Sequence, residues 1–172
     1  MTFKKIVVAT DGSANANRAV RTAGEVAARY EAEVFILHTV LEGPIPDALL
    51  QWARVEHLVE DDPQLLPQWP GYGNLGVIGP RQPKVAYDTR VQLGRAILDY
   101  AKTHAREAGA QKITEVIDEG DAASAVVALV RREQANLAVV GTRGLGTLEG
   151  ALIGSTSHKL IAQHICPVLA VP

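Results

Sequence analysis

The sequence predicts an α/β fold, a single doubly wound parallel sheet of five strands flanked by helices. Short aliphatic runs alternate with amphipathic segments of helical length along the 172 residues, which is the order of βαβ units. Aromatic residues make up only 5% of a chain that is 47% hydrophobic, so Ala, Val, Ile and Leu must build the core, as in buried parallel strands. The length suits one domain, residues 1–172.

Each predicted strand is a short aliphatic run, and each predicted helix carries apolar residues at helical spacing. Gly109 is expected to stop one helix and Asp121 to cap the next. All strands should end at one edge of the sheet, where ligands of such folds bind. The strands are expected at residues 5–10, 33–40, 112–117, 137–140 and 168–171, and the helices at 15–30, 85–108, 122–134 and 155–164.

A proline-rich insert at about residues 43–83 interrupts this alternation. Seven of the nine prolines and both tryptophans, Trp52 and Trp69, lie in it. Residues 47–60 are predicted to form a short amphipathic helix, and the remainder is longer than most loops of compact domains. The insert is therefore expected to be functional or mobile.

Charge and composition exclude several classes of protein. The formal net charge of −2 provides no basic field to gather nucleic acid. The single cysteine, Cys166, cannot form an internal disulfide, which fits a reducing compartment. The sequence shows no signal peptide and no apolar stretch long enough to span a membrane. We therefore expect a cytoplasmic protein with neither a nucleic-acid nor a membrane partner.

The loop after the fourth predicted strand carries glycines at positions suited to phosphate binding. Gly141, Gly144 and Gly154 have no Cβ, so the backbone there can approach a phosphate closely. Gly154 precedes a predicted helix, whose free N–H groups and positive dipole end attract anions. Three hydroxyls and a guanidinium add donors, at Ser155, Thr156, Ser157 and Arg143. The loop is therefore predicted to bind phosphate groups, although Arg143 can also be a solvated loop charge.

Other motifs fit less well. Asp11 ends the first predicted strand at the same edge, where it either contacts a ligand or caps the first helix. Glu149 occupies the position at which a dinucleotide fingerprint starting at Gly144 needs its last glycine, and a Walker loop is absent. The sequence contains no nucleophile elbow, no Cys–His signature and no helical pair of zinc-binding histidines. No catalytic set is predicted.

Four segments resemble the universal stress protein family. The family's ATP-binding signature is Gly, two residues, Gly, nine residues, Gly, then Ser or Thr, and the loop that starts at Gly141 has this spacing. Residues 5–13, 37–40 and 166–171 look like the family's first strand with its acidic turn, the end of its second strand and its closing strand. The resemblance covers nearly the whole chain except the insert, and it implies a Rossmann-like sheet.

The resemblance implies ATP as the ligand, with Mg²⁺, and a homodimer formed through strand 168–171. Asp11 would contact the ribose or a phosphate-bound magnesium, and Thr39 would use its backbone to recognise the adenine edge. The implied nucleotide-binding residues are Ala9, Thr10, Asp11, Thr39, Val140, Gly141, Arg143, Gly144, Gly154, Ser155, Thr156 and Ser157.

The implied function is that of an ATP-binding stress-response regulator in which the nucleotide acts as a conformational ligand. Two alternatives stay open. One is a slow ATPase or nucleotidyl transferase on the same fold, and the other is a partner-binding module with an empty nucleotide site. The insert leaves the second strand beside the expected adenine site, so it could cover the adenine or block the site.

Overall fold

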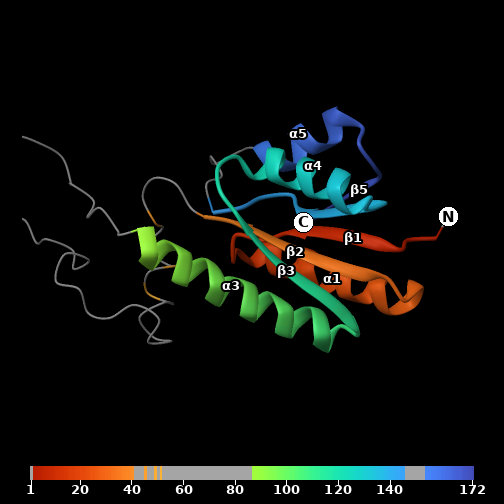
Figure 1. Ribbon diagram of the computed structural model, residues 1–172, viewed down its shortest axis with the longest axis horizontal. Helices are drawn as coiled ribbons and strands as arrows, with labels where there is room; N and C mark the ends of the chain where they lie inside the picture. Colours follow the sequence, from red (N-terminus) through yellow and green to blue (C-terminus); the bar gives the residue numbers. More distant parts are fainter. Residues whose placement is uncertain (1, 41–44, 46–48, 50, 52–86, 146–153) are drawn as a thin grey trace, which may run out of the picture.

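The computed structural model describes residues 2–40, 45, 49, 51, 87–145 and 154–172 (Figure 1). Most of the insert lies outside the described residues, and with it lie Trp52, Trp69 and most of the helix predicted at residues 47–60. The tip of the glycine loop, residues 146–153, also lies outside them. Ile45 and Leu49 are described, and both are buried.

The predicted fold class is confirmed: one sheet of five parallel strands is flanked by helices. The observed bounds differ from the predicted ones by at most two residues. The strands are β1 (Lys5–Ala9), β2 (Glu33–Thr39), β3 (Lys112–Asp118), β4 (Leu137–Gly141) and β5 (Val168–Val171). The described helices are α1 (Ala14–Tyr30), α3 (Tyr87–Glu107), α4 (Ala122–Glu133) and α5 (Ser155–Gln163).

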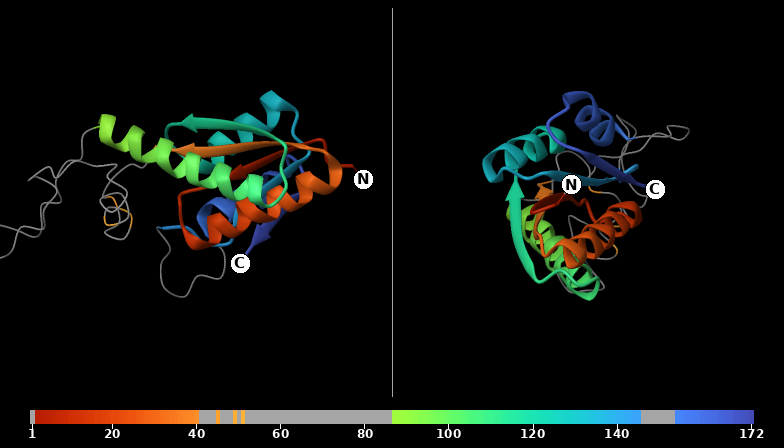
Figure 2. Two further views of the ribbon diagram at one scale, coloured as in Figure 1. Left: turned by 90° about the horizontal axis from the view of Figure 1, so that it is seen from below. Right: turned by 90° about the vertical axis from the view of Figure 1, so that its right-hand side faces the viewer.

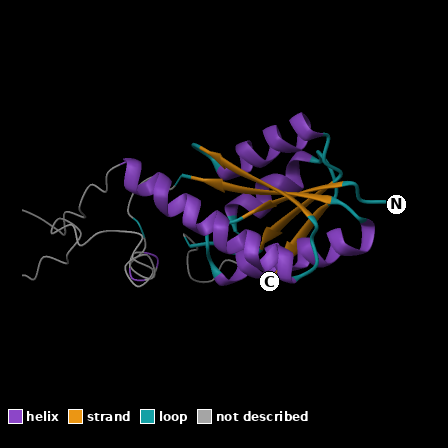
Figure 3. Ribbon diagram, turned by 60° about the horizontal axis from the view of Figure 1, so that its bottom comes forward, coloured by secondary structure: helices purple, strands orange, loops and turns teal. Residues whose placement is uncertain are grey.

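The strand order places the carboxyl ends of β1 and β4 side by side. The order across the sheet is β3-β2-β1-β4-β5, so the chain moves outward from β1 to β3 and then returns to the other side of β1. Figure 3 shows the sheet between its flanking helices. The point at which a doubly wound sheet reverses its order is where such folds bind ligands, beyond the carboxyl ends of the strands. The structure therefore has its switch point between the ends of β1 and β4.

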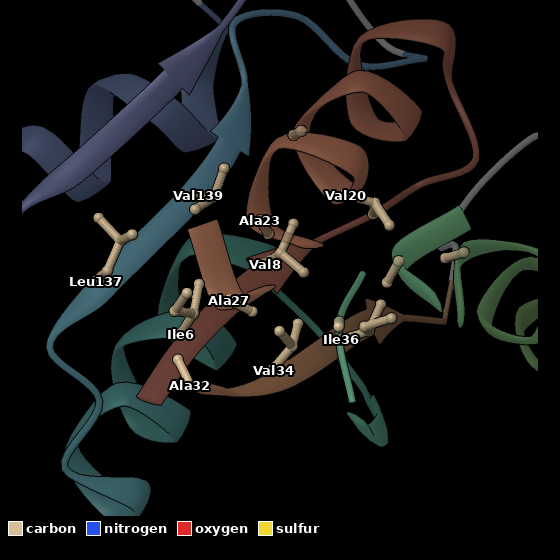
Figure 4. Close-up of a cluster of buried hydrophobic side chains, with 14 of the residues drawn as sticks. Ile6, Val8, Val20, Ala23, Ala27, Ala32, Val34, Ile36, Leu137 and Val139 are labelled. Carbon is tan, nitrogen blue, oxygen red and sulfur yellow. The ribbon is translucent and has the colours of Figure 1, made fainter. Parts of the chain in front are cut away.

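Two apolar clusters lie on opposite faces of the sheet, because successive side chains of a strand point to opposite faces. Ile6 and Val8 of β1 pack in the cluster under α1 and α3, together with Val34 and Ile36 of β2 (Figures 2 and 4). Val7 packs in the other cluster, under α4 and α5. Both faces of the central strands are thus buried, which explains their uninterrupted aliphatic sequences.

The helix ends are set by local polar contacts. Ser13, rather than Asp11, is the N-cap of α1: its hydroxyl accepts a hydrogen bond from the Ala16 amide at 3.2 Å. Asp121 caps α4, as predicted, by accepting from the Ser124 amide at 3.0 Å. Gly109 follows α3 with a φ of +103°, a conformation suited to a glycine stop. In the described part of the chain, no helix is both long and apolar enough to cross a membrane.

Candidate functional site

Asp11 fastens the glycine loop to the end of β1. One carboxylate oxygen, Oδ2, accepts a hydrogen bond from the Leu145 amide at 2.7 Å, and the other accepts from the Ser13 amide at 3.0 Å. The backbone of Gly144 lies so close to this carboxylate that a Cβ there would collide with Oδ2. The sequence placed Asp11 and the loop at one edge, and the structure brings them into direct contact.

The two ends of the glycine loop meet at Thr142. The Gly154 amide donates to the Thr142 carbonyl at 2.5 Å, and the Thr142 amide donates to the Val171 carbonyl of β5 at 2.7 Å. The Asn15 side chain, in the first turn of α1, donates to the Thr142 hydroxyl at 3.4 Å. The loop thus leaves β4 and returns to the start of α5 at one fixed point.

The first and last glycines of the loop are required by close backbone contacts. A Cβ on Gly141 would lie 3.0 Å from the Asn15 carbonyl carbon, because the end of β4 packs directly on the first turn of α1. A Cβ on Gly154 would lie 3.1 Å from the Thr142 carbonyl oxygen. Both distances are tighter than most Cβ contacts in proteins, so side chains at these positions would require the neighbouring backbone at the base of the loop to shift.

The first turn of α5 begins at the base of this loop. Its N-cap is Gly154, which has no side chain to accept a bond from the amides that follow. Ser155 is exposed and Thr156 is half-buried. Ser157 is buried, and its hydroxyl donates to the Gly141 carbonyl at 2.8 Å. The Ser157 hydroxyl therefore supports the loop from beneath, while the positive end of the α5 dipole lies at the switch point.

His38 is a buried contact of the site that the sequence analysis did not assign to it. Its ring Nδ1 donates to the Thr10 carbonyl at 2.9 Å, and burial lowers the pKa of the imidazole. The Thr10 hydroxyl in turn accepts from the Gly12 amide at 3.2 Å. The available signal was a polar residue inside the aliphatic run of the second strand, because a buried histidine needs a hydrogen-bond partner.

The remaining predicted residues lie around the same edge. Ala9 is the half-buried last residue of β1, Val140 is the buried penultimate residue of β4, and Thr39 ends β2. Arg143 is exposed beside the loop. Within the described residues, no three His, Cys, Asp or Glu side chains are grouped closely enough to hold a metal ion.

Comparison with known proteins identifies relatives over almost the whole length of the chain. The profile of the "Universal stress protein family" matches residues 2–66 and 74–172. A universal stress protein of Mycobacterium tuberculosis is 30% identical over 169 residues, which cover 98% of this chain and 96% of the relative. One of Methanocaldococcus jannaschii is 28% identical over 171 residues, with 98% and 82% covered.

Solved structures with the same fold support this relationship. A universal stress protein in complex with cAMP is 27% identical, has a TM-score of 0.63, and is matched over 100% of this chain and 98% of its own. A universal stress protein of Lactobacillus plantarum shares the fold at 16% identity, with a TM-score of 0.69 over 100% and 99% of the two chains. On the evidence of the profile and of these relatives, the chain belongs to the universal stress protein family.

Proposed function

We propose that this protein binds ATP together with Mg²⁺ at the edge between β1 and β4, and that the nucleotide acts as a conformational ligand in a stress-response regulator. One observation carries the proposal: two contacts fix the described ends of the glycine loop beside the start of α5, and the first turn of that helix has no side-chain cap. Asp11 holds its first turn, Thr142 holds its base, and Gly154 leaves the first turn of the helix without a side-chain cap. Such an arrangement suits an anion.

The phosphates would lie at the first turn of α5. The backbone amides of residues 155–157 would donate to them, and the hydroxyls of Ser155 and Thr156 would add further donors. Ser157 would act through its backbone, because its hydroxyl already donates to the Gly141 carbonyl. Arg143 is exposed beside the loop, where its guanidinium would face the outer phosphates.

The ribose and magnesium would lie near Asp11. Each oxygen of this carboxylate accepts one amide hydrogen bond, and a carboxylate has about four acceptor positions, so it can still bind a hydroxyl or a magnesium-bound water. Magnesium bound with a nucleotide takes most of its ligands from phosphates and water. The ion would therefore arrive with ATP, which fits a site whose described residues form no acidic cluster.

Adenosine recognition is supported by the relative that was solved with cAMP, which is 27% identical to this chain. ATP and cAMP share the adenosine and differ in the phosphates. The uncapped start of α5, the hydroxyls of Ser155 and Thr156 and the exposed Arg143 suit a chain of phosphates, and we therefore propose the triphosphate as the ligand. A direct comparison of the two nucleotides tests this choice.

Titration of nucleotide-free protein with ATP and Mg²⁺ is expected to release heat and to raise the melting temperature, with ADP competing. Binding only to the folded state at one hundred times the dissociation constant stabilises it by about 2.7 kcal/mol. Calorimetry with ATP, cAMP and GTP in parallel provides the measurement. The proposal would be abandoned if ATP gave neither heat nor a thermal shift, and the choice of ATP if only cAMP bound.

Two alternatives are separated by simple assays. A slow ATPase or nucleotidyl transferase would release phosphate or pyrophosphate in the presence of Mg²⁺, whereas a conformational ligand would be recovered intact. A partner-binding module with an empty site would be purified without nucleotide. Extraction of the purified protein and identification of the released nucleotide therefore distinguish this third role from the first two.

We further propose that the protein forms a homodimer through β5. In the β4–β5 ladder the Pro167 and Val171 carbonyls face β4, so the backbone groups of Val168 and Ala170 face away from the sheet. Leu169 exposes 37% of its surface on the same strand. An apolar edge of this kind promotes association unless it is covered, and a second copy of the strand would cover it.

Leu169→Glu is expected to convert the dimer into a folded monomer, because it places two like charges in a symmetric interface. Ile117→Glu is the matched control, since Ile117 is 38% exposed on the opposite edge strand, β3. Sedimentation equilibrium measures the result. A point substitution is sharper than deletion of β5, because Val168 and Val171 also pack against the core. A Leu169→Glu protein that stayed dimeric would contradict the proposed interface.

A further inference from the structure

The ladder between β1 and β2 stops two residues short of the end of β2. Ala9 is paired with Leu37, and the Thr10 amide donates to the Leu37 carbonyl at 2.9 Å. Alternate residues of a strand turn their backbone groups to the same neighbour, so Thr39 faces β1 as Leu37 does. The Val40 amide faces the other way and donates to the Asp118 carbonyl at 2.8 Å. The backbone of Thr39 is thus directed toward the end of β1.

The Thr10 carbonyl and the Gly12 amide, which would continue the ladder to Thr39, form hydrogen bonds with side chains instead. A regular parallel ladder would join the Thr39 amide to the Thr10 carbonyl and the Gly12 amide to the Thr39 carbonyl. Instead, the Thr10 carbonyl accepts from His38 Nδ1 at 2.9 Å, and the Gly12 amide donates to the Thr10 hydroxyl at 3.2 Å. Across the described residues, no hydrogen bond joins the backbone of Thr39 to β1 or to the turn that follows it.

Among the described residues, the Thr39 amide and carbonyl on this side have no backbone partner, so they offer a donor beside an acceptor. The pairing edge of adenine has the complementary pattern, with an acceptor at N1 and a donor at the N6 amino group. We infer that His38 and Thr10 are positioning residues for adenine recognition, because they hold the ladder open and leave the Thr39 backbone for the base. This inference rests on the proposed function and deepens it.

The surroundings of His38 fix its ring in the position that this role needs. The side chain is 1% exposed, and a Cβ on Gly94 of α3 would lie 2.8 Å from its Cδ2 atom. The backbone of α3 thus packs directly against the buried imidazole. Because a carbonyl oxygen only accepts, Nδ1 carries the hydrogen in this contact.

A pair of variants tests the role of His38. His38→Leu removes the donor, whereas His38→Asn keeps one, since the asparagine Nδ2 occupies the position of the histidine Nδ1. The probes are ATP and ITP, whose hypoxanthine has a donor at N1 and an acceptor at O6, the reverse of adenine. We expect the ratio of ATP to ITP affinity to fall about tenfold in His38→Leu, and to stay within about threefold of the wild-type ratio in His38→Asn.

The other outcomes are equally decisive. If both nucleotides lose affinity equally in His38→Leu, or if the ratio does not change, the histidine supports the fold and the inference is wrong. If the wild-type protein binds neither nucleotide, the proposed function fails as well. These two failures are distinguishable because the wild-type titration is measured first.

Thr10 provides a second test that does not depend on the folding of His38→Leu. Thr10→Val removes the hydroxyl that holds the Gly12 amide, and Thr10→Ser retains it. We expect the nucleotide preference to fall in the first variant and to persist in the second. In the wild-type protein, the Thr39 amide should exchange its hydrogen rapidly without ATP and slowly with it. An amide already protected in the nucleotide-free protein would overturn the inference.

Discussion

Gly154→Val is expected to lower the affinity for ATP at least about a hundredfold while the protein stays folded. The Cβ of a new side chain would lie 3.1 Å from the Thr142 carbonyl oxygen, and valine adds two methyl groups beyond it. The Gly154 amide and this carbonyl form the 2.5 Å bond that closes the loop. Spreading them would turn the first amides of α5 away from the phosphates, and losing two charge-assisted hydrogen bonds costs about 3 kcal/mol.

The fold should tolerate this change. Gly154 has a φ of −71° and a ψ of 162°, a conformation open to any residue, and it lies at the surface edge of the sheet. The free energy of unfolding should change by less than about 1 kcal/mol. Calorimetry and urea unfolding measure the two effects, with Gly154→Ala as an intermediate and Ala128→Val, on the exposed side of α4, as the control. Unchanged affinity in a folded Gly154→Val protein would mean that the loop does not hold phosphate.

Gly24→Val is expected to have the opposite effect, a large loss of stability with no loss of intrinsic affinity. Gly24 is buried in α1, and a Cβ there would lie 2.7 Å from both the Ala105 carbonyl oxygen and the Ala108 Cβ. A side chain would separate α1 from α3, and overpacking of this kind costs about 3 kcal/mol. For a domain of this length, that lowers the melting temperature by about 6–12 °C.

Glu25→Val is the matched control, since it places the same side chain at the next, exposed position of the same helix. Its cost should stay within about 1 kcal/mol. Gly24 lies ten residues beyond the start of α1, or roughly 15 Å along the helix axis from the site. The folded fraction of Gly24→Val should therefore bind ATP as the wild type does. A variant as stable as the control would mean that the helices do not pack as closely as described.

The fold could be predicted from the sequence because the spacing of apolar residues distinguishes its strands from its helices. The central strands are buried on both faces, so the run from Val34 to Leu37 has no polar interruption, and the helices show a clear apolar stripe. The parallel direction of the strands followed from the alternation of strands and helices, whereas their order across the sheet came from the structure. The cap of α1 could not be predicted with the same certainty, because Asp11 and Ser13 both suit that role and only the path of the loop decides between them.

The candidate site was predicted in its parts but not in its contacts. The spacing of the glycines identified the loop and its edge. Spacing does not show which way a hydroxyl points, so Ser157 was indistinguishable from Ser155, although the structure buries it against Gly141. The contacts of Asn15 and His38 join residues far apart in the chain, and a single sequence does not show which partner such a side chain meets.

The burial of the central strands on both faces has a consequence for synthesis of the chain on the ribosome. One face of the sheet can be covered by α1 and α3 once residue 107 has been made. The other face, which carries Val7, Phe35 and Leu37, has to wait for α4 and α5, which end at residue 163. Between residues 37 and 163, at about 5–20 residues per second, that aliphatic surface stays uncovered for roughly 6–25 s. The growing chain thus carries a target for chaperones through most of its translation.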